Sequence, residues 1–104
     1  MSTTPQYPLY QRFSKTATDD LVFQIVLADK WFEFLDIFIY TNNAYVGDFN
    51  GQDVLVAAGA VYTITAPCNL KDFYFKNVGA GSNTTVVVAG VELAEGRKRV
   101  LGLI

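Results

Sequence analysis

Short runs of apolar and β-branched residues, separated by turn residues, repeat along the chain between residues 32 and 93. Asn42-Asn43, the Asn50-Gly51 step and the Gly-rich residues 79–83 are the turn signals between them. The runs are residues 38–41, 44–47, 54–59, 61–65, 73–75 and 84–88. Several short strands at a spacing of roughly 8–12 residues are typical of an antiparallel sandwich or barrel. The pattern therefore predicts an all-β domain.

Two further strands are predicted from apolar patterning. Residues 21–27 place their apolar side chains on one face by alternation. Residues 31–41 form a longer run that is apolar on both sides, and Glu33 and Asp36 interrupt opposite faces of it. This interruption predicts a bulge or a polar contact near the middle of the strand. A helix over residues 29–38 is the alternative, but enrichment in β-branched and aromatic residues favours the strand.

The two ends of the sequence have patterns of their own. Residues 1–19 contain Pro5 and Pro8, which cannot donate backbone hydrogen bonds, so the segment is expected to be an extended arm. This arm would dock on its own domain or on a neighbour. Gly90 interrupts a Val-rich run and predicts a bulge or bend. Residues 100–104 are apolar almost throughout, which predicts a packed strand.

A length of 104 residues fits one domain with one core. We expect a single antiparallel β-sandwich or jelly-roll-like domain of about seven or eight strands over residues 20–104, preceded by the extended N-terminal arm over residues 1–19. Hydrophobic residues make up 51% of the chain and charged residues 17%, which is apolar for a small domain. This excess must be covered, either on both faces of the sheets or against other copies or another protein.

Charge and hydropathy exclude several classes of partner. The net charge is −2 and the pI is near 4.8, so nucleic acid is not an expected partner. No apolar run reaches the roughly 18 residues that a membrane span requires, so no membrane contact is expected. Residues 1–8 have neither a basic region nor an apolar core, which predicts no secretion signal and synthesis in the cytoplasm.

Few residues in this chain could carry out chemistry. With no histidine and one cysteine, Ser–His and Cys–His pairs and ordinary zinc sites are excluded. The adjacent Asp19 and Asp20 could form a carboxylate pair, but acidic residues in loops are usually soluble surface. Cys68 is expected to be a buried small hydrophobe and not a reactive thiol. We therefore expect no enzyme, no catalytic residue and no cofactor.

One loop could in principle hold a metal ion. Asp48, Asn50 and Asp53 offer hard oxygen atoms around a turn that Gly51 permits, which is the chemistry that calcium prefers. The spacing differs from that of an EF-hand loop, so a plain Asn-Gly turn is favoured and no metal site is expected.

Aromatic residues allow two interpretations. Trp31, Tyr40, Tyr45, Tyr62 and Tyr74 could form a platform on which sugars stack. Packing in the core or in an interface is favoured, because aromatic side chains dominate the buried area of small β domains.

The candidate interaction residues lie near the two ends. The basic run near residue 98 holds three of the eight basic residues, and it is either a solvated end of the last strand or a contact for an acidic surface. The arm and the tail could each add a strand to the sheet edge of a neighbour. The candidates are Tyr7, Tyr10, Phe13, Arg97, Lys98, Arg99, Leu101, Leu103 and Ile104.

The order of strands and turns resembles small jelly-roll proteins of tailed bacteriophage particles. The residues that carry the resemblance are 39–43, 45–47, Ala58-Gly59 before 61–65, 69–75 and 84–91. It covers about residues 32–93. Where such proteins usually have Gly-Glu before the middle strand, this chain has Gly59-Ala60.

The resemblance implies a capsid decoration (cement) protein or a related head or tail component, located in the virion and made in the host cytoplasm. It implies no catalytic residues. The implied partners are the major capsid protein or another virion protein, and the chain itself in a dimer or trimer. A carbohydrate- or receptor-binding jelly-roll module of a phage tail is the alternative function.

Overall fold

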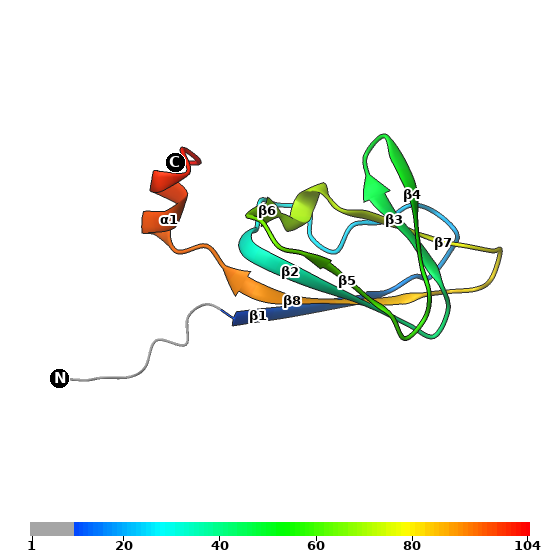
Figure 1. Cartoon of the computed structure of the whole chain (residues 1–104). Helices are drawn as coiled ribbons and strands as arrows, with labels where there is room; N and C mark the ends of the chain where they lie inside the picture. The colour runs from blue at the N-terminus through cyan, green and yellow to red at the C-terminus, as the bar shows by residue number, and fades with distance from the viewer. Residues whose placement is uncertain (1–9) are drawn as a thin grey trace.

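The computed structural model describes residues 10–104, which form two packed antiparallel sheets and one short helix (Figure 1). The strands are β1 (Tyr10–Thr16), β2 (Trp31–Tyr40), β3 (Ala44–Asp48), β4 (Gly51–Val56), β5 (Val61–Ile64), β6 (Cys68–Asn69), β7 (Tyr74–Asn77) and β8 (Thr85–Glu92), joined by the 3₁₀ turn η1 (Leu70–Asp72) and followed by α1 (Glu95–Val100). The larger sheet has the order β1-β8-β2-β5, with β6 paired to β2, and the smaller sheet has the order β4-β3-β7. The predicted all-β sandwich is confirmed.

The core lies between the two sheets and is centred on β2 and β8. Alternate residues of β2 point inward, so Leu35, Ile37 and Ile39 are fully buried. Val86 and Val88 of β8 lie opposite Ile39 and Ile37 and are also fully buried. Burying a side chain of this kind contributes about 1.5–3 kcal/mol. The smaller sheet adds Ala44, Val46, Val56 and Phe75 to the same cluster.

A bulge in β2 brings an additional aromatic residue to the core face. The register of β2 against β8 shifts between Phe32 and Phe34, so Glu33 is the extra residue. Phe32 thereby joins Leu35 on the buried face. Both predicted alternatives occur: the bulge lies at Glu33, nearer the start of the strand than its middle, and Asp36 makes a polar contact with the hydroxyl of Thr63. Gly90 lies in an uninterrupted β8 opposite this bulge, where a Cβ atom would collide with the Phe34 carbonyl oxygen.

The strand predicted over residues 21–27 is wrong. Phe23 alone forms a bridge, to Phe75 of β7, through two backbone hydrogen bonds of 2.9 and 2.8 Å. The middle of the segment packs against the core, whereas Leu21 and Leu27 are 70% and 82% exposed. The four-residue strand β7 pairs with this segment at Phe75 alone, so most backbone groups of residues 21–27 have no strand partner.

Residues 10–16, which the sequence assigned to an extended arm, form the edge strand β1 of the larger sheet. All seven residues of β1 pair with β8. Both prolines of the expected arm precede this strand, so they remove no donor from its ladder. Tyr7 and the other residues of the segment 1–9 lie outside the described residues. Residues 10–16 are therefore part of the sandwich and not of an arm.

The strand predicted over residues 100–104 is also wrong, because the chain turns into α1 after β8. The first turn of α1 is acidic and its last turn basic, which suits the helix dipole. Gly102 has a φ of 75°, and its N–H donates to the carbonyl of Arg99 while the N–H of Leu103 donates to that of Lys98. These two bonds form a Schellman motif. Gly102 is therefore a helix stop signal.

Candidate functional site

Most of the predicted interaction residues gather at one end of the sandwich, where β1 begins and β8 leads into α1 (Figure 1). Tyr10, the first residue of β1, pairs with Val91 near the end of β8 because the two strands are antiparallel. Residues far apart in the sequence thus share one end of the molecule. The predicted residues found here are Tyr10, Arg97, Lys98, Arg99, Leu101, Leu103 and Ile104.

Residues 95–104, called the terminal segment below, project from this end. No residue of α1 is buried. Two aliphatic side chains of the terminal segment are largely exposed, Val100 at 76% and Ile104 at 63%. Leu101 is 40% exposed. A helix of six residues is too short to be stable on its own in water. The exposed aliphatic side chains therefore offer an apolar surface that a partner could cover.

One ion pair holds the terminal segment to the sandwich. The guanidinium of Arg97 donates two hydrogen bonds to the carboxylate of Glu33, at 3.0 Å from Nε and 3.1 Å from Nη2. These bonds raise the pKa of Arg97 above its ordinary value. Arg99 lies 4.0 Å from Glu95, and Lys98 forms no ion pair with any described residue. Because Arg97 is paired with Glu33, Lys98 and Arg99 are the cations of the terminal segment that remain more available to a partner.

Phe13, another predicted interaction residue, contacts its own core. Its ring meets that of Phe32 edge to face, with centroids 6.4 Å apart. The ammonium of Lys30 lies 5.6 Å from the Phe13 centroid. Phe13 therefore packs against the core from the edge strand β1 and stabilises the docking of this strand.

The outward side of the larger sheet, called the outer face below, is a second exposed apolar surface that sequence reasoning did not single out. Tyr40 of β2 is 46% exposed and Val61 of β5 is 49% exposed. The rings of Phe38 and Tyr40 stack with centroids 6.5 Å apart. The feature of the sequence that could have revealed the outer face is the apolar character of β2 on both of its sides. The large apolar residues on this side of the sheet are Phe34, Phe38, Tyr40, Val61, Val87 and Val91, of which Val87 is itself buried.

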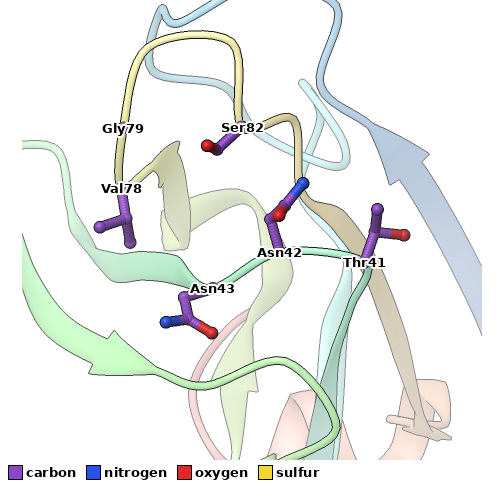
Figure 2. Close-up of a pocket in the computed structure, with 6 residues that line it drawn as sticks. All are labelled: Thr41, Asn42, Asn43, Val78, Gly79 and Ser82. Carbon is purple, nitrogen blue, oxygen red and sulfur yellow. The ribbon is translucent and has the colours of Figure 1, made fainter.

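A cavity of about 260 Å³ lies at the opposite end of the sandwich, between the β2–β3 connection and the loop before β8 (Figure 2). Its lining consists of Thr41, Asn42, Asn43, Val78, Gly79 and Ser82. The amide of Asn42 donates to the carbonyl of Asn83 at 2.9 Å, and the amide oxygen of Asn43 accepts from the Ala58 N–H at 2.8 Å. Both amides therefore hold loops together.

A buried polar network continues behind this cavity. The amide of Asn77 donates to the carboxylate of Asp20 at 2.9 Å, and its oxygen accepts from the Thr84 N–H at 2.9 Å. The Thr84 hydroxyl donates to the Asn42 carbonyl at 2.8 Å. Among the described residues, every buried side-chain polar atom has a partner. The network joins three loops and leaves no buried donor or acceptor for a ligand.

The five aromatic residues considered as a sugar platform do not form one group: Tyr45 and Tyr74 lie on neighbouring strands of the smaller sheet, whereas the other three lie in the larger sheet. Trp31 and Tyr40 are the first and last residues of β2 and therefore lie at opposite ends of the strand. Tyr74 is partly buried against the ring of Phe49, with centroids 5.8 Å apart. None of these aromatic residues lines the cavity of Figure 2.

The loop considered for calcium is a tight hairpin turn. The carboxylate of Asp48 accepts hydrogen bonds from the backbone N–H groups of Asn50 (2.8 Å) and Gly51 (3.1 Å). This carboxylate thus closes the turn between β3 and β4. In residues 10–104, no cluster of three or more acidic or cysteine side chains has the arrangement to hold a metal ion.

Cys68 lies in β6 and is half-buried. Burial raises the pKa of its thiol to about 11, with a smaller contribution from the negative charge of Asp72. At neutral pH the thiol is therefore almost fully protonated and a poor nucleophile.

No known protein family, curated protein or solved structure matches this chain. Within the described residues, no helix is long and apolar enough to cross a membrane.

Proposed function

We propose that this chain is a non-enzymatic structural protein of a virion, a capsid decoration protein that binds the shell and stabilises subunit junctions. The observation that carries the proposal is the terminal segment. It projects from the sandwich, buries none of its helical residues, and combines exposed aliphatic side chains with Lys98, which forms no ion pair with a described residue, and Arg99, which is paired only with Glu95 at 4.0 Å. Such a segment suits a contact with an apolar patch that has acidic residues at its rim.

The path of the chain between the sheets also supports this proposal. The chain passes from β1 in the larger sheet to the Phe23 bridge beside β7, then to β2, and returns to the smaller sheet in β3 and β4. It then alternates through β5, β7 and β8. Counting the bridge, each layer contains four neighbouring segments. This interleaving is the order expected of a jelly roll, a fold that occurs in viral capsid and lectin domains, and it supports that part of the proposal.

The mechanism is attachment by many weak contacts. A single terminal segment offers a small contact area, so one copy alone would bind weakly. Copies that are linked to one another and sit on a symmetric lattice bind as one multivalent unit, and their combined affinity exceeds that of each contact by orders of magnitude. The sandwich then acts as a rigid body that spans a junction between coat subunits.

The experiment begins with virus particles purified from cells that carry the native gene of this chain. Mass spectrometry is expected to find the chain in the particle fraction, and purified chain is expected to rebind to particles from which it has been stripped. The double variant Leu101→Asp/Ile104→Asp should weaken rebinding by at least about tenfold, because it places charges in the apolar contact. Lys98→Glu/Arg99→Glu should weaken it most at low salt.

The matched control is Leu27→Asp, which changes an aliphatic residue that is 82% exposed and lies outside the terminal segment. This variant should rebind like the unmodified chain. A chain found only in particle-free fractions would overturn the proposed function. Saturable binding to a glycan array would instead support the carbohydrate-binding alternative.

A further inference from the structure

The outer face of the larger sheet has the wrong composition for a surface in contact with water. Antiparallel sheets that face solvent on one side usually alternate apolar residues inward with polar residues outward. Here the outward positions of β2 include the partly exposed Phe34 and Phe38, and those of β8 include the partly exposed Val91 and the buried Val87. In Figure 1 the smaller sheet and α1 lie above the larger sheet, and no described element lies below it.

We propose that this outer face packs against the same face of a second copy, which forms a two-fold symmetric dimer. The partner surface is self-complementary, as a two-fold interface requires. The two larger sheets would stack at about 10 Å with their strands roughly aligned, as in other sheet-on-sheet packing. This inference does not depend on which particle the chain binds.

One row of residues across the sheet favours a second copy as the occupant. Arg12 of β1 and Asp36 of β2 both lie opposite Ala89 of β8, on its two sides. The cation and the anion are therefore separated by two strand spacings, about 10 Å. A two-fold axis that runs along β8 beside Ala89 places Arg12 of each copy opposite Asp36 of the other. No like charges meet in this arrangement.

The charged groups of this row have free capacity in the single chain. Arg12 forms no ion pair with any described residue. The carboxylate of Asp36 accepts a hydrogen bond from the hydroxyl of Thr63 at 2.8 Å, which leaves its remaining lone pairs open. Ala89 at the centre of the row is small, so the two sheets can approach closely there.

The size of the outer face sets the strength of the interface. With the two-fold axis along β8, the strands β1, β8 and β2 of one copy lie opposite β2, β8 and β1 of the other, and β5 has no strand opposite it. Three strands at about 4.8 Å spacing, with an overlap of about seven residues, cover about 350 Å² of sheet. Two copies would therefore bury about 700 Å² together, which is below the roughly 1,000 Å² of a stable specific interface, so we expect a weak dimer that dissociates on dilution.

The test is sedimentation equilibrium of the full chain over a range of concentrations. The expected result is a reversible transition from 11.5 kDa to twice that mass. Arg12→Asp and Asp36→Arg should each raise the dissociation constant by at least about tenfold, because each places like charges opposite one another. The double variant Arg12→Asp/Asp36→Arg exchanges the two charges and should restore dimerisation. This rescue also shows that the variants fold.

Phe38→Arg tests the apolar part of the face and should abolish the dimer, while Leu27→Asp should leave it unchanged. Three results would overturn the inference. The first is a chain that stays monomeric at several hundred micromolar, and the second is a dimer that none of the outer-face variants weakens. The third is a dimer lost on deletion of residues 1–9 but insensitive to both charge variants, which would make that segment the contact.

Discussion

At the scale of single residues, Asn69 shows how one buried side chain joins two segments that are distant in the sequence. Its amide oxygen accepts from the backbone N–H groups of Lys30 (3.0 Å) and Lys71 (3.1 Å), and its amide nitrogen donates to the carboxylate of Asp29 (3.0 Å). This last bond, with help from the Lys71 ammonium, lowers the pKa of Asp29. Two of its three bonding partners, Lys30 and Asp29, lie 39 and 40 residues away, beyond the reach of local sequence patterns.

Cys68, the neighbouring residue, gives a prediction about pH. Burial raises the pKa of its thiol from 9.0 to about 11, so the thiolate fraction near pH 8.5 should be about 100-fold smaller than in the unfolded chain. We expect iodoacetamide to alkylate the native chain correspondingly more slowly than the chain in urea. Mass spectrometry of timed samples measures both rates.

The sign of the linked effect on stability follows from the same shift. The folded chain holds the thiol proton more tightly, so the contribution to stability is fully present below pH 9.0 and is lost as the pH rises through about 11. Equal alkylation rates in native and unfolded chain would contradict the assigned burial. A Cys68→Ser variant provides the blank for alkylation at other groups.

At the scale of elements, α1 is the clearest case of a short structure stabilised by its ends. Gly102 terminates the helix with a positive φ, and Arg97 joins its side to Glu33 in the bulge of β2. The bulge that brings Phe32 into the core thus also presents the carboxylate that binds α1. The position of the terminal segment depends on both features.

Replacing Gly102 should therefore unwind the end of α1. In Gly102→Ala, the left-handed conformation would cost about 1–2 kcal/mol, because a Cβ atom crowds the following carbonyl oxygen. In this variant we expect faster hydrogen exchange at the backbone N–H groups of residues 102 and 103, which form the Schellman bonds. The unfolding midpoint of the sandwich should not change.

Gly96 is the matched control for this change. It lies inside α1, and an added Cβ would meet no atom within 4 Å. Gly96→Ala should strengthen the helix by up to about 1 kcal/mol. Slower exchange in Gly102→Ala, or no difference between the two variants, would contradict the role of Gly102 as a helix stop.

At the scale of the whole molecule, the sandwich is closed by strands from opposite ends of the sequence. Strand β1 covers the edge of β8, and Phe13 covers Phe32 in the core. The segment that the sequence assigned to an arm is thus part of the cooperative unit. Long-range pairing of this kind also predicts slow folding, on the order of milliseconds to seconds.

Two truncations test whether β1 belongs to the folded unit. A chain that begins at Tyr10 should unfold in urea with nearly the same midpoint as the full chain. A chain that begins at Ala17 loses Phe13 and the whole pairing partner of one edge of β8, so its stability should fall by at least about 3 kcal/mol. An unchanged midpoint in the second truncation would show that residues 10–16 are a dispensable arm, as the sequence suggested.

The sequence by itself determined the local elements of this protein. Alternation and turn chemistry act over a few residues, so the strands now labelled β2, β3, β5 and β8 and the bulge near Glu33 could be predicted from them. The composition likewise showed that the excess of apolar residues must be covered by other parts of the chain or by a partner. These features depend on neighbours in the chain.

Only the tertiary structure decided which segments found partners. Residues 21–27 alternate like a strand but pair with β7 through Phe23 alone, and residues 10–16 pair with a strand about 70 residues away. The same sequence pattern therefore gives either a strand or a loop, because a strand is stable only when another backbone satisfies its hydrogen bonds. The location of the apolar surplus on the outer face was decided in the same way, by which side of the larger sheet the smaller sheet covers.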